Sequence, residues 1–230
     1  MTDLTLKPLS HTCWESRIEI VKAIKFQVLE IRDALLQLVK TSEDPKTESE
    51  ADCLATYEIE SFEFLLAMTI WYDILFVVNS VSKNLQSKNM HIYVAIDQLK
   101  GLLSFLKKYR EDGFTFAMNS SKEIATKMEI EPIFREKRII RRKKQFDENV
   151  NDETTQSAEE YFRINYFLYI VDQAIFSIES RFEQFQIYEN IFGFLFNFEK
   201  LKSPDDDSLK KIVLILNVFS HMKLILILMA

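Results

Sequence analysis

The sequence predicts an all-α protein in which long antiparallel helices surround an aromatic-rich core. Only three of its 230 residues are glycine, against about 16 expected from average usage. Glycine supplies the positive-φ turns and the close backbone approach that hairpins and phosphate-binding loops need. Apolar residues make up 47% of the chain and recur at the three- and four-residue spacing of helices. The 19 phenylalanines supply the aromatic side chains of the core.

The first helix is expected from Trp14 to Ser42. Thr12 is a suitable N-cap residue, and Glu15 three residues later completes the pattern of a capping box. Pro45 ends the helix because proline disfavours helical geometry at the residue before it. The apolar residues of this stretch form one stripe at helical spacing, namely Trp14, Ile18, Val21, Ile24, Val28, Ile31, Leu35 and Leu38.

A second, very long helical stretch is expected over residues 46–87, with a break near Thr56 or Glu60. Its first half is strongly acidic, because eight carboxylates and one lysine lie between residues 43 and 63.

The second half of this stretch, residues 62–81, is apolar nearly all round, which indicates a central core helix. Glu63, Asp73 and Asn79 interrupt it, and a transmembrane helix tolerates such residues only at a substantial cost. A membrane is therefore not expected as a partner. We expect Asp73, like Asp97 in the next helix, to be buried and hydrogen-bonded rather than catalytic.

A third helix is expected over residues 90–111. Asp112 and Gly113 end it, with Gly113 at the C′ position that glycine favours. A shorter helix follows over residues 114–128, and Pro132 ends the first half of the chain. The apolar residues of the third helix keep helical spacing, namely Ile92, Ile96, Leu99, Leu103 and Leu106.

The composition changes sharply over residues 133–157, where we expect a flexible loop. Seven cations fall within ten residues, and a run with six carboxylates and no cation follows over residues 147–160. Three interpretations stay open: a solvated loop whose cations pair with the acidic run, a phosphate-binding segment, or a nuclear localisation signal. The cations are Arg135, Lys137, Arg138, Arg141, Arg142, Lys143 and Lys144.

Helical order is expected to resume at Ala158 and to extend to about Phe196. The core-facing positions of this part are Leu168, Val171, Ile175, Ile178, Phe182 and Phe185. The last 19 residues, 212–230, contain no acid and little periodicity. The patterns divide the chain into a short leader (1–11), helical region A (12–132), the loop (133–157), helical region B (158–202) and an atypical apolar tail (203–230).

The overall composition indicates an intracellular protein without a metal or other cofactor. The net charge of −6 argues against a generally basic nucleic-acid binder. Cys13 and Cys53, with three histidines elsewhere, do not form a zinc pattern, and Cys53 is expected to be buried and inert. The first ten residues do not have the pattern of a signal peptide. We therefore expect the nucleus or the cytoplasm, and no small-molecule substrate.

Residues 11–17, HTCWESR, resemble the Thr-Arg-Trp block of hAT-superfamily DNA transposases. The similarity covers roughly residues 11–211, and the chain looks like the transposase-derived group described as zinc finger MYM-type protein 1-like. The segments that carry it are FEFLLAMTIWYDILFVVNSVSKNLQSK, AIDQLKGLLSFLKKY, EPIFREKRIIRRKKQFD and YFLYIVDQAIFSIESRFEQFQ.

The resemblance implies a specific origin for the fold. In that family an all-α domain is inserted into an RNase H-like sheet, and the block lies near the entry to the insertion. This chain would then be mostly the helical insertion, with residues 1–11 a remnant of the preceding core. Cys13 stands where the family has arginine, and the tail from residue 212 departs from the family, which is polar there. We expect that tail to result from a shifted reading frame or altered splicing.

The resemblance also implies that the chain is not an enzyme. The family cuts and joins DNA with three carboxylates that hold two divalent metal ions. Two of these acids lie upstream of the block and one lies downstream of the insertion. Ten residues precede the block, too few for the strands that hold the first two acids, so we expect no catalytic residues here.

The candidate DNA-contact residues are Trp14 and the seven cations Arg135, Lys137, Arg138, Arg141, Arg142, Lys143 and Lys144. Trp14 either stacks on an extruded base or acts as an apolar staple at the helix start. The leading hypothesis is a truncated, non-catalytic hAT-type protein with residual DNA contact. The alternative is a helical interaction module that binds another protein, or itself, through apolar helix faces.

Overall fold

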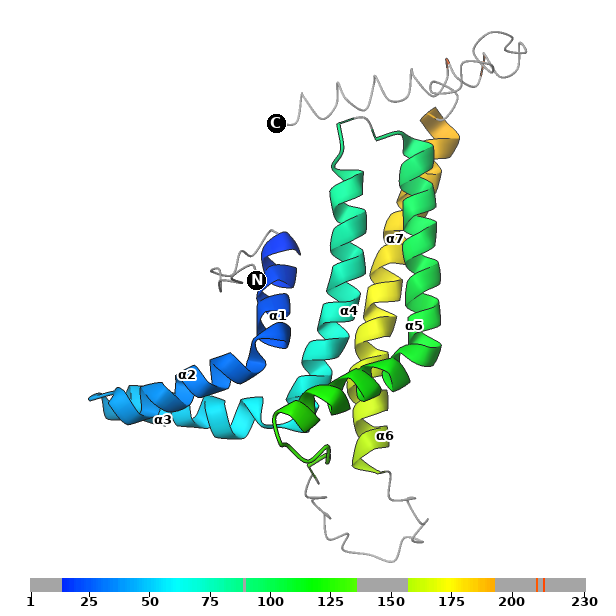
Figure 1. Cartoon of the computed structure of the whole chain (residues 1–230). Helices are drawn as coiled ribbons and strands as arrows, with labels where there is room; N and C mark the ends of the chain where they lie inside the picture. The colour runs from blue at the N-terminus through cyan, green and yellow to red at the C-terminus, as the bar shows by residue number, and fades with distance from the viewer. Residues whose placement is uncertain (1–13, 89, 136–156, 193–209, 211–212, 214–230) are drawn as a thin grey trace, which may run out of the picture.

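A computed structural model describes residues 14–88, 90–135 and 157–192, together with residues 210 and 213 (Figure 1). Within these ranges the chain is helical and contains no strand, so the all-α prediction is confirmed. The expected N-cap Thr12, most of the loop 133–157 and nearly all of the apolar tail 203–230 lie outside the described residues. The elements are α1 (Trp14–Phe26), α2 (Val28–Thr41), α3 (Pro45–Asp52), the π-helix η1 (Cys53–Ile59), α4 (Phe62–Leu85), α5 (Ile92–Lys127), α6 (Ala158–Phe162), the π-helix η2 (Arg163–Leu168) and α7 (Tyr169–Phe192).

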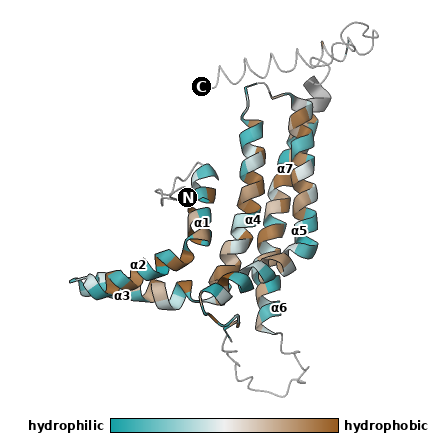
Figure 2. Cartoon of the chain, viewed as in Figure 1, coloured by the Kyte–Doolittle hydropathy of each residue, from teal (hydrophilic) through white to brown (hydrophobic). Residues whose placement is uncertain are grey.

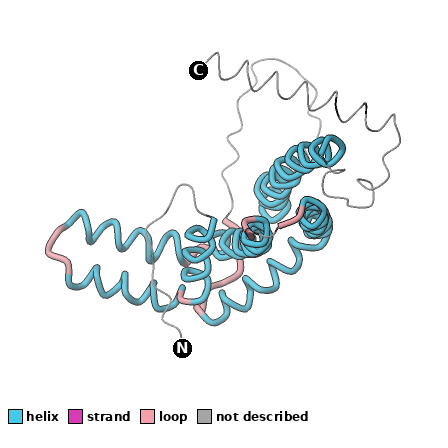
Figure 3. The backbone as a smooth tube through the Cα atoms, turned by 90° about the horizontal axis from the view of Figure 1, so that it is seen from above, coloured by secondary structure: helices cyan, strands magenta, loops and turns pink. Residues whose placement is uncertain are grey.

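Three long helices, α4, α5 and α7, form the body of the molecule and run antiparallel to their neighbours (Figure 1). The helix α5 packs against both α4 and α7, and α1 covers another side of α4. The view from above shows α2 and α3 side by side as an arm that extends away from this bundle (Figure 3). The arm therefore extends from one side of the bundle.

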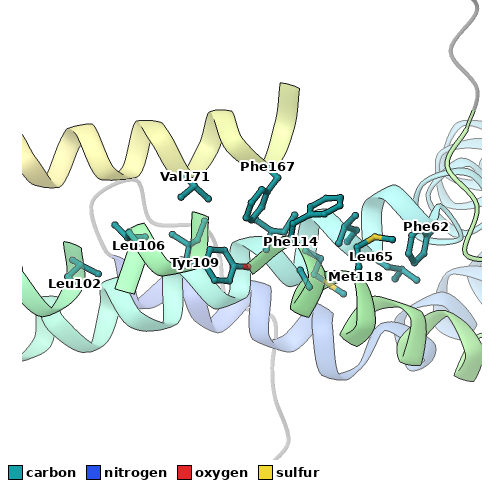
Figure 4. Close-up of a cluster of buried hydrophobic side chains, with 14 of the residues drawn as sticks. Phe62, Leu65, Leu102, Leu106, Tyr109, Phe114, Met118, Phe167 and Val171 are labelled. Carbon is teal, nitrogen blue, oxygen red and sulfur yellow. The ribbon is translucent and has the colours of Figure 1, made fainter. Parts of the chain in front are cut away.

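The core of the bundle is aromatic where α5 packs against η2 (Figure 4). The ring of Phe167 lies 5.4 Å from that of Phe114 and 5.6 Å from that of Tyr109, measured between centroids. Aromatic pairs at this spacing add to the stability that comes from burial alone. The most deeply buried large side chains are Phe62, Phe167, Leu65, Leu66, Ile70, Leu106, Met128 and Val171.

The single first helix expected from Trp14 to Ser42 is two helices. Gln27 leaves helical geometry, with φ −126° and ψ 25°, and separates α1 from α2. The two halves of the apolar stripe pack on different elements, because α1 lies along α4 whereas α2 lies along α3 and η1. No proline or glycine occurs between residues 14 and 41, so tertiary packing sets this bend.

The arm follows the sequence-based expectations more closely. The helix α2 ends at Thr41, and the Asp44 carboxylate caps α3 by accepting hydrogen bonds from the backbone N–H groups of Lys46 and Thr47. Its hydrogen bonds with Thr47 lower the pKa of the Asp44 carboxyl. Pro45 occupies the first turn of α3. Backbone N–H groups in the first turn have no acceptor within the helix, so the lack of an N–H in proline costs no hydrogen bond there. The expected break near residues 56–60 is confirmed. The π-helix η1 follows α3 directly and ends at Ile59, and α4 begins at Phe62.

The expected helix end at Gly113 is wrong, because α5 continues through it to Lys127. Gly113 has no positive φ and is therefore not a C′ glycine. A Cβ atom at this position would lie 2.5–2.7 Å from atoms of the Tyr109 ring, one helical turn earlier. Figure 1 shows that α5 changes direction part-way along its length. Glycine at residue 113 therefore leaves the space that the Tyr109 ring occupies beside the helix backbone.

The C-terminus of α5 is held by a cap and by α2. The Ile130 N–H donates to the Ala125 carbonyl at 2.9 Å and the Glu129 N–H to the Thr126 carbonyl at 3.2 Å, which is the Schellman pattern. Glu129 occupies the left-handed position of this cap with φ 59°. The Arg32 side chain on α2 donates to the Met128 carbonyl at 3.2 Å. This contact ties the arm to the bundle.

The helix α4 is long and apolar enough to cross a membrane by length and composition, the one such helix among the described residues. Figure 2 shows apolar residues along much of its length. The core helix of a soluble protein has the same properties. Here α4 packs against α1 and α5, and it buries Leu65, Leu66, Ile70 and Ile74.

The two glycines of α5 provide a matched pair of substitutions. We expect Gly113→Ala to destabilise the protein by about 1–3 kcal/mol, because the new methyl group overlaps the Tyr109 ring. Gly101→Ala meets nothing within 4 Å and should stabilise the protein by up to about 1 kcal/mol through helix propensity. Urea unfolding followed by far-ultraviolet circular dichroism measures both. Equal effects of the two substitutions would contradict this account of Gly113.

A second substitution tests the cap of α5. Glu129→Gly should stabilise the protein by about 1 kcal/mol, because an L-residue in left-handed geometry is strained and glycine is not. The matched control is Glu123→Gly in the interior of the same helix, which should destabilise by about 1 kcal/mol. Thermal unfolding of both variants gives the comparison. A loss of stability in the Glu129 variant would show that its side chain outweighs the backbone strain.

Candidate functional site

The most perturbed ionisable groups in the described structure meet where α1, α4 and α5 come together. Asp73 lies on α4, and the Tyr109 hydroxyl of α5 donates to its Oδ2 at 3.1 Å. The Lys25 Nζ of α1 lies 3.8 Å from Asp73 Oδ1 and 4.5 Å from the centre of the Tyr72 ring. The Lys25 side chain is 11% exposed and that of Asp73 is 29% exposed. Asp73 is thus a partly buried hydrogen-bond acceptor, in line with expectation.

Burial controls the ionisation of this cluster. Desolvation raises the pKa of Asp73, although Lys25 and the Tyr109 hydroxyl both act to lower it. Desolvation lowers the pKa of Lys25, and the charge of Asp73 acts in the opposite direction. The pKa of Tyr109 is raised by burial and by its contacts with Asp73, so its hydroxyl stays protonated as a donor. The cluster is a half-buried ion pair completed by a neutral phenol.

Lys25 also borders a pocket of about 260 Å³ between the α1–α2 bend and the C-terminal part of α5. Val28, Leu29 and Ile124 provide its apolar lining. Phe26 at its edge is 58% exposed and meets the Tyr72 ring edge-on. The remaining lining residues are Glu30, Ser120, Glu123 and Lys127, so the pocket carries charges of both signs.

The start of the basic segment is fixed to the lower end of the bundle. The Phe134 ring lies between Phe62 at the start of α4 and Phe162 of α6, at centroid distances of 5.4 and 5.7 Å. Arg135 stacks its guanidinium 4.3 Å from the centre of the Tyr57 ring and donates to the Tyr57 carbonyl at 2.7 Å. Tyr57 belongs to η1, so the arm and α6 together hold the residue from which the cationic run continues.

The structure describes two of the predicted DNA-contact residues and does not bring them together as one site. Trp14 is the first residue of α1, and its side chain lies outside the described residues. Arg135 is already engaged with Tyr57. The other predicted contacts lie outside the described residues, namely Lys137, Arg138, Arg141, Arg142, Lys143 and Lys144.

Two sequence-based expectations about single residues are wrong. Cys53 is exposed rather than buried, because it begins η1 on the solvent side of the arm. Asp97 is exposed and lies 3.8 Å from Lys100, three residues later on the same helix face. Within the described ranges no three His, Cys, Asp or Glu residues come close enough to hold a metal ion.

The sequence pattern indicates Asp73 but not the other members of its cluster. A lone acid in the apolar run 62–81 was the available signal, because a buried carboxylate needs a donor or a cation nearby. Lys25 and Tyr109 lie 48 and 36 residues away in the sequence, so only the packing of α1 and α5 on α4 identifies them as its partners.

No family model matches this chain, and no solved structure matches it. The resemblance to hAT transposases therefore stays a prediction that rests on the sequence segments alone.

Replacing one member of the ion pair tests its role. Lys25→Met should destabilise the protein by about 2 kcal/mol at pH 7, because it leaves the Asp73 carboxylate partly buried without its cation. Removal of Lys25 also raises the pKa of Asp73 further above its unfolded value. Folded protein then binds the proton more tightly than unfolded protein, so the loss should shrink as the pH falls from 7 towards 4.

The control is the double variant Lys25→Met with Asp73→Asn, which carries no charge in the cluster. Its stability should be close to that of the wild type at pH 7. Because the pKa of Asp73 is already raised in the wild type, the double variant should lose some stability relative to the wild type as the pH falls towards 4, which is opposite in direction to the change expected for Lys25→Met. Urea unfolding at several pH values measures all three proteins. A Lys25→Met loss that is the same at pH 4 and pH 7 would show that Asp73 does not titrate as described.

Proposed function

We propose that this chain is a non-catalytic helical protein derived from an hAT-type transposase, and that it contacts DNA through residues 135–144. The sequence resemblance supports the origin, and the cationic run supports the contact. Carboxylates in the described part that have cationic partners are distributed over separate elements, such as Asp73 on α4 and Asp172 on α7. They serve as ion-pair partners there. This distribution supports a binding role rather than a catalytic one.

The observation that carries the proposal is the anchoring of Phe134 and Arg135. A basic segment that leaves a rigid base loses less conformational entropy on binding than a free chain does. Phe134 is packed between α4 and α6, and Arg135 is fixed on η1. The six cations between residues 137 and 144 begin two residues after Arg135 in the sequence.

Contact with phosphates makes binding strongly dependent on salt. Each phosphate neutralised by a lysine or arginine releases condensed counterions, so the logarithm of the affinity falls by about 0.9 per contact for each tenfold rise in salt. If the cations instead pair with the acidic run 147–160, they do not contact phosphates, and the chain would not show this salt-dependent affinity for DNA. The salt slope therefore separates DNA contact from a solvated loop.

We expect the full chain to bind a 20-base-pair duplex at 50 mM salt and to lose roughly 100-fold or more in affinity at 200 mM. Replacing Arg141, Arg142, Lys143 and Lys144 by alanine should reduce the salt slope by about 3 to 4 and abolish binding at the higher salt. Fluorescence anisotropy of labelled DNA measures both quantities.

The matched control removes four exposed cations from α5 instead, namely Lys100, Lys108, Lys122 and Lys127. This control variant changes the net charge as much as the variant of residues 141–144 does, and it should keep most of the affinity for DNA. Equal losses in the two variants would indicate a general charge effect and contradict the proposal. No metal-dependent cleavage of the duplex is expected, and cleavage that a single carboxylate substitution abolishes would contradict the non-catalytic assignment.

A second candidate function is a helical interaction module. Large apolar side chains stand more than half exposed on three helices of the bundle, with Phe76 on α4 at 56%, Phe116 on α5 at 66% and Phe176 on α7 at 71%. Exposed apolar groups of this size support contact with another protein surface. Apolar association should be nearly independent of salt and unaffected by the four alanine substitutions in residues 141–144, so the same titration distinguishes it.

A further inference from the structure

The arm formed by α2, α3 and η1 carries a large excess of negative charge. Residues 28–60 contain nine carboxylates and three cations, a net charge of −6 that equals the net charge of the whole chain. Three of these carboxylates have a cationic partner, namely Asp33, Glu50 and Glu60. The others have no ion pair among the residues that the structure describes, namely Glu30, Glu43, Asp44, Glu48, Asp52 and Glu58.

Three members of this second group lie along α3 and η1, between the tip of the arm and the bundle. Glu48 and Asp52 belong to α3 and Glu58 belongs to η1, and all three are exposed. We call Glu48, Asp52 and Glu58 the acidic row. Tyr57, next to Glu58 in the chain, is 62% exposed and holds the Arg135 guanidinium over its ring. One cationic side chain from the start of the basic segment is therefore already bound at the inner end of the row.

We infer that the exposed side of α3 and η1 is a docking surface for residues 136–144 of the same chain, and that DNA competes with the arm for these cations. The inference deepens the proposed function and rests on it for the competition, whereas the docking itself needs no DNA. Residues 135–144 contain seven cations and one carboxylate, a net charge of +6. This charge is equal and opposite to that of the arm, and the contact of Arg135 with Tyr57 joins the two.

The chain beyond Arg135 is long enough to follow the arm to its tip. Asp44, at the tip, precedes Tyr57 by 13 residues, which is about 20 Å along a helix. The nine residues 136–144 span up to about 30 Å when they are extended. The four consecutive cations 141–144 can therefore lie level with the acidic row.

The tether makes this attraction effective, although a single surface ion pair is weak. Because Arg135 is held on the arm, the cations that follow it in the sequence meet the acidic row at an effective concentration of roughly millimolar order. Salt screens the attraction, since the Debye length falls from about 10 Å at 0.1 M to about 3 Å at 1 M. The docking should therefore be strongest at low salt.

Zero-length cross-linking of the full wild-type chain tests the docking directly. A water-soluble carbodiimide joins a carboxylate to a lysine amine only where the two are in contact, and mass spectrometry of the digested protein identifies the joined pairs. At about 50 mM salt we expect Lys137, Lys143 or Lys144 to be joined to the acidic row, and the yield to fall at least fivefold at about 1 M salt. The matched carboxylates are Glu111, Asp112 and Glu123 on α5, which are also exposed and should give an at least fivefold lower yield at the lower salt.

Two results of this experiment would overturn the inference. Cross-links of the three lysines only to carboxylates of residues 147–160 would show that the cations pair with the acidic run instead of the arm. Equal yields for the acidic row and for the α5 carboxylates would show that the lysines have no preference for the arm.

A matched pair of triple variants tests the competition with DNA. Glu48→Gln with Asp52→Asn and Glu58→Gln neutralises the acidic row, and Glu111→Gln with Asp112→Asn and Glu123→Gln removes the same charge from α5. All six side chains are exposed, so both variants should fold. In the anisotropy titration at about 50 mM salt, we expect the first variant to bind the duplex at least fivefold more tightly than the second, with a difference that shrinks as the salt concentration rises.

Equal affinities of the two variants for DNA would contradict the competition. If neither variant nor the wild type bound DNA, the proposed function would fail, and the cross-linking yields alone would decide whether the basic segment docks on the arm.

Discussion

The contact of Tyr109 with Gly113 is the constraint on which most of this structure depends. The absence of a side chain at residue 113 lets the Tyr109 ring lie against its own helix. From that position its hydroxyl reaches Asp73 on α4, and its ring meets Phe167 of η2. Asp73 in turn holds Lys25 of α1. One side chain thus connects α4, α5 and η2 directly, and α1 through an ion pair.

The long-range contacts around Tyr109 determine which parts of the molecule stay exposed and could bind a partner. The two π-helices each place a tyrosine in a long-range contact, Tyr57 with Arg135 and Tyr166 with Trp71. The first fixes the start of the basic segment, and the second helps to orient α7. The candidate binding surfaces that we propose are of two kinds: the cationic run that follows Arg135 in the sequence, and the exposed apolar side chains of the bundle helices. The first would suit DNA phosphates, and the second would suit an apolar surface of another protein.

Local sequence signals predicted the helical class, the break before residue 62 and several helix starts, because capping residues and three/four spacing act over a few residues. Helical order was expected from Ala158, and α6 begins there, with the Ser157 side chain accepting from the Glu160 N–H. The bend at Gln27 and the continuity of α5 through Gly113 could not be predicted in this way. Both depend on what packs against the helix, namely η1 and α3 for the bend and the Tyr109 ring for the glycine. Among the candidate DNA contacts the sequence identified Arg135, but it could not identify Tyr57 as the residue that holds Arg135, because the two lie 78 residues apart in the chain.

The central claim is that residue 113 must lack a side chain because of the Tyr109 ring, and a double-mutant cycle between these two positions tests it most directly. Urea unfolding would compare the effect of Gly113→Ala in the wild type with its effect in Tyr109→Ala. Once the ring is removed, the added methyl group has space, and its helix propensity should make it neutral or stabilising by up to about 1 kcal/mol. This account predicts that the destabilisation by Gly113→Ala disappears in the Tyr109→Ala background. An equal destabilisation in both backgrounds would contradict it.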